Sequence, residues 1–471
     1  MEKNWSGQNI LIIGAARQGL ALARYLAARG AVVTLNDRRT ADQMTAIIQS
    51  MQDQPGGAQV RWALDGHPLE LLDQASLVCV SGGVPLTLPI IAEALHRSLP
   101  LTNDSQIFME AVKAPVIGIT GSAGKTTTTT LVGRIADAFA RESRAAGAKC
   151  SAWLGGNIGR PLVEYVDEIQ PDDLVVVEFS SFQLELMTTS AQISAVLNIT
   201  PNHLDRHGTL EAYTAAKARI LDFQEAGDIA VLNRDDPGSW ALRHKVRGRL
   251  VSFGRQRPTS GEPGAFLEAG YLKYWDGHQD IDLVPQSLVH LRGEHNLINV
   301  LAACAIARAA GWSVSAIQDG VRDFTGVAHR LEYVATRQGV AWYNDSIATA
   351  PERTIAAIEA FDEPLVLLLG GRDKNLPWDK LASLLHQRVD HVVVFGEAAG
   401  KILEAIGSPR AGSRLQTVQH EPHLHEAVQA AARLAEPGAV VLLSPGGTSF
   451  DEFVDFEERG ERFREWVKAL L

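Results

Sequence analysis

The sequence predicts an α/β protein made of three domains in series. A chain of 471 residues exceeds the roughly 250–300 residues at which a single hydrophobic core stops growing. Short apolar runs alternate with longer Ala-, Leu- and Arg-rich segments of helical character, which is typical of parallel sheets covered by helices. The runs at Ile10, Val116 and Leu365 each open a new α/β unit. The expected domains are residues 1–103, 104–326 and 327–471.

The apolar runs have the features of buried strands. They are short, apolar at successive positions and followed by glycine-rich or polar turns, as expected for strands with both faces covered. The Gly- and Pro-rich stretch at 254–277 instead predicts a loop and a hairpin inside the second domain. The predicted strands include Ile10–Ile13, Val116–Ile119, Leu174–Val177, Leu365–Leu369, His391–Phe395 and Val440–Leu443.

Composition and charge narrow the class of protein. Hydrophobic residues make up 46% of the chain and charged residues 21%, as in soluble globular proteins. The formal net charge of -11 argues against a broad surface for nucleic acid or anionic membrane, because such a surface needs an extended basic face. A small anionic ligand needs only a locally basic pocket. We therefore expect small-molecule partners and no nucleic acid.

The ends and the cysteines add expectations about compartment. The segment Met1–Ser6 leads directly into a strand pattern and lacks the parts of a secretory signal. No apolar stretch approaches the ~20 residues that span a bilayer, so we expect a cytoplasmic protein without membrane insertion. Cys79, Cys150 and Cys304 are odd in number and widely spaced, which predicts free thiols rather than disulfides or a zinc site.

The strongest chemical signal is a glycine-rich turn between the strand at Val116 and a helix that extends to about Ala140. Backbone N–H groups of such a turn bind phosphate oxygens, and the helix N-terminus adds positive potential. Lys125 is placed to reach the terminal phosphates of ATP, and Thr126 is placed to bind magnesium. Ile119 stands where a strict Walker A pattern has glycine, so the loop is a variant form. The expected ATP-binding residues of the loop are Gly121, Ser122, Ala123, Gly124, Lys125, Thr126 and Thr127.

Two later segments place polar side chains at the same edge of the sheet. Glu178 follows the apolar run at Leu174, and ligands of open α/β sheets collect at the carboxyl ends of strands, so Glu178 is the first candidate magnesium ligand. The alternative role for such a carboxylate is helix capping or an ion pair. His203 and His207 follow the next predicted strand, at 194–199. We expect His203 to bind a second metal ion and His207 to be structural.

A helix predicted from about Thr209 carries Tyr213 and Lys217, four residues apart and so on one face. Taken alone, a helical lysine is a solvated surface charge. A lysine whose amine is kept neutral by burial or by neighbouring positive groups can take up carbon dioxide as a carbamate and become an anionic metal ligand. The residues alone leave both interpretations of Lys217 open.

The first domain opens with a turn similar to that of dinucleotide-binding proteins. The segment from Gly14 to Gly19 follows a strand, and Asp37 comes roughly 20 positions further on. Ala16 stands where such proteins have the glycine that lets the backbone approach a pyrophosphate. This substitution weighs against an NAD-dependent oxidoreductase, which is the rival interpretation of the turn.

The motifs follow one another in an order that resembles the Mur ligases along nearly the whole chain. Within that family, the sequences of residues 178–185 and 449–460 resemble those of the branch that adds glutamate. The matching segments are 121–127, 155–159, 178–185, 202–207, 213–217, 293–299, 329–332, 344–346, 369–374 and 443–451.

The resemblance implies a fold and an activity. It implies a Rossmann-like N-terminal domain, a central P-loop ATPase-like domain and a Rossmann-like C-terminal domain. The implied reaction is the ATP-dependent addition of glutamate, most simply D-glutamate, to UDP-N-acetylmuramoyl-L-alanine through an acyl phosphate, in peptidoglycan precursor synthesis. It also implies two Mg²⁺ ions, a carbamylated lysine and a monomer.

The resemblance assigns residues to five sets. Catalytic roles are implied for Lys125, Glu178, His203 and Lys217. Metal ligation is implied for Thr126, Glu178, His203 and Lys217 as carbamate. Further ATP contacts are implied for Asn296, Asn299, Arg330 and Asp345. Contacts with the UDP-substrate are implied for Arg17, Gln18, Asp37, Arg38, Arg39, Gly83, Asn157 and His203. Glutamate contacts are implied for His329, Thr349, Lys374, Ser449 and Phe456.

Two positions depart from the family pattern. Ile347 stands where the commonest form of the motif has lysine, and Ala350 replaces a frequent asparagine. Both lie at the start of the third domain, so they concern amino-acid recognition more than ATP chemistry. A branch that adds L-glutamate is therefore the first alternative.

Two other classes share part of the pattern. A folylpolyglutamate synthase has the same phosphate loop and adds glutamate, but it does not need the N-terminal domain at 1–103. A non-enzymatic ATP-binding scaffold would have the phosphate loop but would not require Glu178, His203 and Lys217 in combination.

Overall fold

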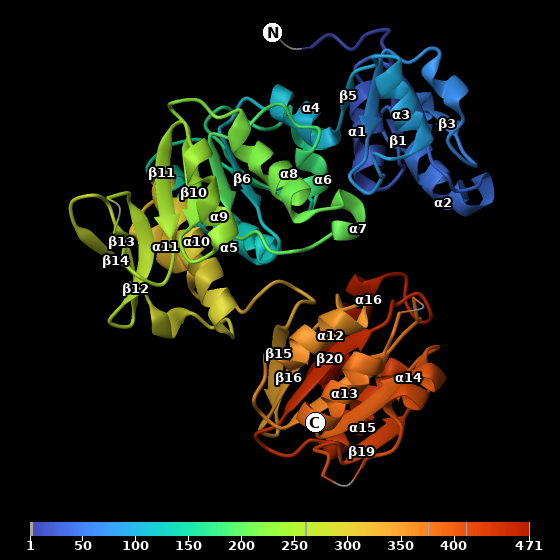
Figure 1. Cartoon of the computed structure of the whole chain (residues 1–471), viewed down its shortest axis with the longest axis vertical. Coiled ribbons are helices and arrows are strands. Elements are labelled where there is room, and N and C mark those ends of the chain that lie inside the picture. Colours follow the sequence, from blue (N-terminus) through green and yellow to red (C-terminus); the bar gives the residue numbers. More distant parts are fainter. Residues whose placement is uncertain (1–2, 260, 375, 411, 471) are drawn as a thin grey trace. The chain divides into compact units, whose positions relative to one another are not determined.

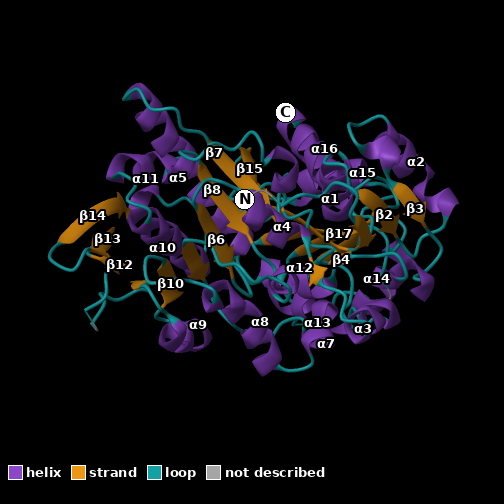
Figure 2. Ribbon diagram, turned by 90° about the horizontal axis from the view of Figure 1, so that it is seen from above, coloured by secondary structure: helices purple, strands orange, loops and turns teal. Residues whose placement is uncertain are grey.

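The computed structural model describes residues 3–470 except 260, 375 and 411. The chain forms three sheets in two compact units (Figures 1 and 2). One unit comprises the chain up to His290 together with Glu294–Phe324 and contains the first two sheets. The other comprises Leu291–Gly293 and the chain from Thr325 onward, and contains the third sheet. The predicted α/β class is confirmed.

The first sheet is parallel throughout, with strand order β3-β2-β1-β4-β5. In the central strand, Ile10 and Ile12 pack into one buried cluster while Leu11 and Ile13 pack into another, so both faces of the sheet are covered. This double burial explains the unbroken apolar run. The strands are β1 Asn9–Ile13, β2 Val32–Asn36, β3 Arg61–Ala63, β4 Leu77–Val80 and β5 Leu101–Thr102. The helices are α1 Arg17–Ala27, α2 Ala41–Gln52, α3 Pro89–His96 and α4 Asp104–Ala111, with 3₁₀ turns η1 Gly57–Gln59 and η2 Leu69–Leu72.

The second sheet has strand order β14-β13-β12-β11-β10-β9-β6-β8-β7 and is parallel from β7 to β12. The predicted hairpin is present as the antiparallel pair β12 and β13, and β14 adds a further antiparallel strand that was not predicted. The strands are β6 Val116–Thr120, β7 Ala152–Gly156, β8 Leu174–Glu178, β9 Ile193–Val196, β10 Ile229–Asn233, β11 Arg249–Phe253, β12 Gly264–Glu268, β13 Tyr271–Trp275 and β14 Asp280–Pro285.

Helices and 3₁₀ turns join and cover these strands. The long helix α5 runs five residues beyond the predicted end near Ala140 and stops shortly before Gly147, whose backbone is left-handed (φ +93°). The helices are α5 Lys125–Ala145, α6 Ser181–Leu184, α7 Leu204–His207, α8 Leu210–Asp222, α9 Pro237–Ala241, α10 Glu294–Ala309 and α11 Val314–Val321. The 3₁₀ turns are η3 Leu162–Tyr165, η4 Leu242–Lys245 and η5 Gln286–Leu288.

The third sheet has strand order β15-β16-β20-β17-β18-β19, with only the edge strand β15 antiparallel. Alternate residues of β17 again pack into two separate clusters, with Leu367 on one face and Leu368 on the other. The strands are β15 Glu332–Arg337, β16 Val340–Asn344, β17 Leu365–Gly370, β18 His391–Phe395, β19 Thr417–His420 and β20 Val440–Gly446. The helices are α12 Pro351–Ile358, α13 Asp379–Arg388, α14 Ala399–Ile406, α15 Leu424–Leu434 and α16 Phe456–Ala469.

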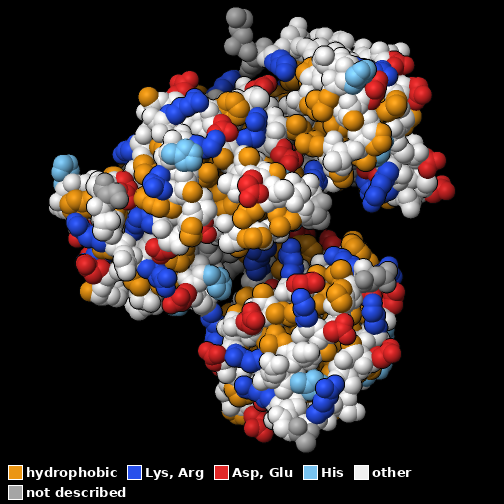
Figure 3. Space-filling view, in the orientation of Figure 1, with side chains coloured by type: hydrophobic (Ala, Val, Ile, Leu, Met, Phe, Trp, Pro, Cys, Tyr) orange, Lys and Arg blue, Asp and Glu red, His pale blue; other side chains and the backbone are white. Residues whose placement is uncertain are grey.

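The surface carries mixed side chains (Figure 3), and the cysteines lie in the interior. Charged side chains are interspersed with hydrophobic ones over the face drawn in Figure 3. Within the described residues, no helix is both long enough and apolar enough to cross a bilayer. Cys79, Cys150 and Cys304 are buried free thiols, as predicted.

Candidate active site

The glycine-rich turn lies between β6 and α5, as predicted. Gly124 has a left-handed backbone (φ +77°) and is the residue before the first turn of α5. A side chain at Gly124 would collide with the amide of Asn299 on α10, so only glycine suits both the backbone and the available space. The Nδ2–H of Asn299 in turn donates a hydrogen bond to Oδ1 of Asn296 at 3.1 Å. Two of the predicted ATP residues are thereby placed beside the loop.

Lys125 begins α5, with its side chain folded back over the turn. Its ammonium group donates to the carbonyl of Gly121 at 2.8 Å and to that of Ser122 at 3.3 Å. The Ser122 hydroxyl also receives a hydrogen bond from the Tyr213 hydroxyl at 3.1 Å, which ties α8 to the loop. The turn therefore holds a cation at the place where a nucleotide's terminal phosphates would add negative charge.

Lys217 is a buried lysine, in contrast to the solvated helical lysine that its sequence position alone allows. Its side chain comes from α8 and only 1% of the residue is exposed. The amine donates to the carbonyl of Gly121 at 2.9 Å and to the hydroxyl of Thr120 at 3.3 Å. Burial, then the positive charge of Lys125, hold the pKa of Lys217 well below its usual range, against the opposing effect of Glu178.

Glu178 ends β8 and is almost completely buried. Its Oε1 accepts a hydrogen bond from the Asn157 side chain at 2.8 Å, whereas its buried Oε2 has no hydrogen-bond partner among the described residues. A buried carboxylate oxygen without a donor is costly, and a bound cation would remove that cost. An oxygen ligand of this kind fits a hard cation such as Mg²⁺.

His203 and His207 have different environments. The side chain of His207 is buried, with its ring nitrogens 3.0 Å from the Ser181 hydroxyl and 3.0 Å from a Glu185 carboxylate oxygen, as suits the structural role predicted for it. His203 is exposed and precedes α7 with a left-handed backbone (φ +53°), while its ring meets the edge of Phe182. Its metal ligation stays a prediction.

Few side chains are available to complete a metal site. In the part of the chain that the structure describes, no three His, Cys, Asp or Glu side chains are grouped so as to hold a metal ion. A metal at Glu178 would therefore need at least some ligands of other kinds. The Thr126 hydroxyl, a modified Lys217 and phosphate oxygens are the candidates at this loop.

The N-terminal turn lies against the same region. Gln18 donates to the carbonyl of Gly156 at 2.5 Å, and Arg17 donates to the carbonyl of Asn157 at 3.2 Å. Because Asn157 also holds Glu178, the predicted UDP-substrate residues of the first sheet adjoin the predicted metal ligand of the second. Both belong to the same compact unit.

Asp37 organises this turn. Burial opposes its ionisation, but hydrogen bonds from Arg39 and from the backbone N–H of Ala15 outweigh that effect and hold the pKa of its carboxyl well below its usual range. Arg39 is thus held by Asp37, while Arg38 and Gly83 are exposed. Contacts of these residues with a UDP group stay predictions.

Sequence reasoning missed Arg206. Its guanidinium donates to the carbonyls of Gly82 at 3.1 Å and Val84 at 2.6 Å, in the loop that follows β4, and stacks on Phe182. Arg206 thereby joins the loop that carries Gly83, a predicted UDP-substrate residue, to the segment that carries His203. Its place between two histidines in the sequence was the available signal.

The second unit contains the residues assigned to glutamate and the remaining ATP residues. Lys374 donates to the Thr349 hydroxyl at 3.2 Å, and partial burial together with the charge of Arg353 lowers the pKa of Lys374. Asp345 accepts hydrogen bonds from the Ser444 hydroxyl at 2.8 Å and from the backbone of Leu331, yet burial raises the pKa of Asp345 to about 7. Arg330, whose charge opposes that rise, lies next to Leu331 in the chain.

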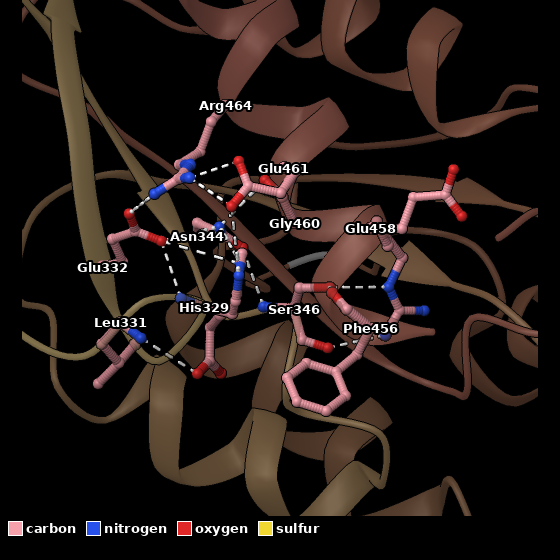
Figure 4. Close-up of polar contacts among 12 residues, drawn as sticks. His329, Leu331, Glu332, Asn344, Ser346, Phe456, Glu458, Gly460, Glu461 and Arg464 are labelled. Atoms are coloured by element: carbon pink, nitrogen blue, oxygen red, sulfur yellow. Dashed lines mark hydrogen bonds and ion pairs between the residues drawn. The ribbon is translucent and has the colours of Figure 1, made fainter. Parts of the chain in front are cut away.

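His329 lies in an enclosed polar cluster beside this segment (Figure 4). Its Nδ1 is 3.0 Å from the Asn344 side-chain nitrogen, its backbone N–H donates to Glu332 at 2.8 Å, and its ring approaches the edge of Phe456. Burial lowers the pKa of His329, so a neutral imidazole is favoured at neutral pH. Its predicted contact with glutamate stays a prediction.

Comparison with known proteins follows the same three-part order. Family models for the Mur ligase MurD-like N-terminal domain, the Mur ligase middle domain and the Mur ligase glutamate ligase domain match residues 8–103, 119–307 and 329–447. A UDP-N-acetylmuramoylalanine–D-glutamate ligase from Pelotomaculum thermopropionicum is 39% identical over 100% of this chain and 99% of its own length. The protein of that name from Geobacillus kaustophilus is 40% identical over 98% of each chain.

Solved structures agree on the fold. MurF from Acinetobacter baumannii superposes with a TM-score of 0.56 at 18% identity, covering 98% of this chain and 91% of that one. Identity this low supports only the shared architecture, whereas the full-length relatives identify the branch. The chain therefore belongs to the Mur ligase family, in the branch of the UDP-N-acetylmuramoylalanine–D-glutamate ligases.

Proposed function

We propose that this protein uses ATP to join the alanyl carboxylate of UDP-N-acetylmuramoyl-L-alanine to the amino group of D-glutamate, in peptidoglycan precursor synthesis. The observation that carries the chemistry is the buried group of Lys217 and Glu178 beside the phosphate loop. The names of the full-length relatives supply the substrates. The match to a MurD-like N-terminal domain favours a UDP-sugar over a folate as the carboxylate substrate.

Magnesium and a carbamate fit the residues present. Among the described residues, Oε2 of Glu178 is buried without a hydrogen-bond partner. Thr126 follows β6, which pairs with the strand of Glu178, and His203 follows β9, which pairs with the other side of β6. Lys217 has the lowered pKa that carbamate formation requires, because only a neutral amine attacks carbon dioxide. We propose that Thr126, Glu178, His203 and carbamylated Lys217 hold two ions. Magnesium bound there would neutralise charge on the ATP phosphates.

The mechanism begins with activation of a carboxylate. Hydroxide is a poor leaving group, so the alanyl carboxylate must first be converted to an acyl phosphate. Lys125 and the N–H groups at the start of α5 stabilise the charge that spreads over the γ-phosphoryl group as a carboxylate oxygen attacks phosphorus and ADP leaves. The amine of glutamate then attacks the acyl carbon, loses a proton and displaces phosphate from a tetrahedral intermediate.

The second unit is proposed to supply the amino acid. Lys374 would bind a carboxylate of glutamate, with Thr349 fixing the direction of its amine. Ser449 is buried and Phe456 partly buried at the two ends of the segment that leads into α16, where they would bound the same pocket. The charge of Arg353 near Lys374 adds a second cation that favours an anionic amino acid.

Lys374→Ala should raise KM for D-glutamate by roughly tenfold or more, because one charge-assisted hydrogen bond to a carboxylate is lost. Initial rates at varied glutamate and saturating ATP and UDP-sugar measure this effect. KM for ATP should stay close to the wild-type value. Lys380→Ala, an exposed lysine on α13, is the matched control. An unchanged KM for glutamate in Lys374→Ala would remove Lys374 from the pocket.

The function is tested by ADP and phosphate release from ATP with Mg²⁺, UDP-N-acetylmuramoyl-L-alanine and either D- or L-glutamate, each with and without the UDP-sugar. Release that needs both the sugar and D-glutamate is the expected result. A preference for L-glutamate would keep the chemistry and change the branch, which is the alternative raised by Ile347 and Ala350. No release with either enantiomer would reject the proposed substrates.

A further inference from the structure

The second unit contains a fully buried arginine to which no role has been assigned. Arg459 lies in the first turn of α16 with 0% of its surface exposed. No carboxylate among the described residues forms an ion pair with it. Burial lowers the pKa of Arg459 to about 10, against the more distant charges of Asp451 and Glu452. Burying a guanidinium in this way is costly, so its hydrogen bonds need an explanation.

The guanidinium makes three hydrogen bonds, all to loop atoms. Nε donates to the Ser346 hydroxyl at 3.0 Å, and Nη2 donates to the Ser346 carbonyl at 2.8 Å. Nη1 donates to the carbonyl of Gly447 at 3.1 Å. The Ser346 hydroxyl itself donates a hydrogen bond to the carbonyl of Phe456 at 2.8 Å (Figure 4).

Three separate segments therefore converge on one side chain. They are the segment that follows β16, the turn that follows β20 and the start of α16. Each of them carries one residue proposed to contact glutamate, namely Thr349, Ser449 and Phe456 respectively. Arg459 itself faces away from solvent and so has no access to a ligand.

We infer that Arg459 is a positioning residue that sets the shape of the glutamate pocket by fixing these three segments relative to one another. The inference rests on the proposed function. A planar guanidinium suits the task because it offers donors in fixed directions to several acceptors, whereas an ammonium group is a single point charge. An apolar side chain of similar length would fill the space and leave the Ser346 and Gly447 carbonyls without their donors.

A purely structural role predicts a different outcome from a positioning role. If Arg459 only stabilised the fold, its replacement would lower the melting temperature and reduce the apparent kcat through loss of folded enzyme, with the KM values unchanged. If it positions the pocket, the folded fraction of a variant should show a selective defect toward glutamate. The relevant readout is therefore KM for each of the three substrates, together with the folded fraction.

The test compares Arg459→Lys and Ser346→Ala with wild type in steady-state kinetics and thermal unfolding. Arg459→Lys should raise KM for glutamate roughly tenfold, with KM for ATP and for the UDP-sugar changed less than about twofold. Ser346→Ala, which removes the hydroxyl but leaves its backbone carbonyl, should give a smaller rise in the same parameter. Arg433→Lys, on an exposed arginine of α15, is the matched control.

The outcomes separate this inference from the proposed function. Equal changes in all three KM values, or a lower melting temperature with an unchanged KM for glutamate, would overturn the positioning role of Arg459. A wild-type enzyme that releases no phosphate with the sugar and glutamate would instead overturn the function. Arg459→Met serves as a second variant. If it folds, it should show the larger glutamate defect, because it provides no donor to either carbonyl.

Discussion

Lys125→Ala is expected to abolish turnover. The Lys125 ammonium group lies over the glycine-rich turn and donates to the backbone carbonyls of Gly121 and Ser122, acceptors that it can exchange for phosphate oxygens. Its removal leaves the charge that develops on the γ-phosphoryl group without its principal side-chain cation. Loss of one such electrostatic contact costs roughly 10²–10³-fold in kcat, and loss of a full charge should reach at least that size.

The measurement is ADP release at saturating substrates by folded Lys125→Ala, with folding checked by circular dichroism. Lys149→Ala removes an exposed lysine from the loop that follows α5 and should behave as wild type. ADP release by Lys125→Ala at near-normal rates would show that the glycine-rich turn is not the nucleotide site. The variant also tests Lys217, because loss of the Lys125 charge removes one cause of its lowered pKa.

Lys217→Ala should also lose most of its activity, and short carboxylic acids such as formate or acetate should restore part of it. The buried amine is proposed to carry a carbamate, whose negative charge a free carboxylate can imitate in the space left by the truncated side chain. The expected loss is again on the order of 10²-fold in kcat, because a ligand of the metal that stabilises phosphate charge is removed.

Two further arms make this prediction specific. Lys217→Arg keeps a cation but cannot form a carbamate under these conditions, so it should be inactive and should respond less to added carboxylic acids. Removal of dissolved carbon dioxide and bicarbonate should slow the wild-type enzyme, and it should slow the control variant Lys149→Ala to the same extent. Unimpaired Lys217→Ala would remove the carbamate from the mechanism, whereas inactivity without rescue by any acid would favour a purely structural amine.

Parts of this site could be predicted because they follow from local patterns. A strand, a glycine-rich turn and a lysine define the phosphate loop within a few residues, and Glu178 follows from the position at which an apolar run ends. The alternating burial of β1 and β17 similarly follows from unbroken apolar runs, since strands covered on both faces need no polar positions.

Other parts depend on contacts between distant segments. Nothing local distinguishes Lys217 from a surface lysine, because its burial comes from β6 and the phosphate loop, roughly a hundred residues earlier in the chain. Asp37 looked like a free ligand in the sequence, yet Arg39 and the Ala15 backbone occupy both of its oxygens. The strand β14 was missed because polar residues alternate through it at the edge of the sheet.

Arg459 shows a further limit of prediction from the sequence. It lies four and eight residues before Phe463 and Val467, on the buried face of α16, so its position on an apolar stripe was visible in the sequence. A charged residue on such a stripe is ordinarily expected to reach the surface with its end group. Only the loops at 346 and 447 show that the guanidinium is bonded inside the protein.

The central step of the proposed reaction is the activation of the alanyl carboxylate by ATP as an acyl phosphate, before glutamate attacks. The most direct test uses UDP-N-acetylmuramoyl-L-alanine with oxygen-18 in both carboxylate oxygens, and mass spectrometry of the phosphate and the amide product. One labelled oxygen should appear in each phosphate released, because the oxygen that attacks phosphorus leaves with it, and the other should stay in the amide carbonyl. Amide product formed with unlabelled phosphate would contradict the acyl phosphate.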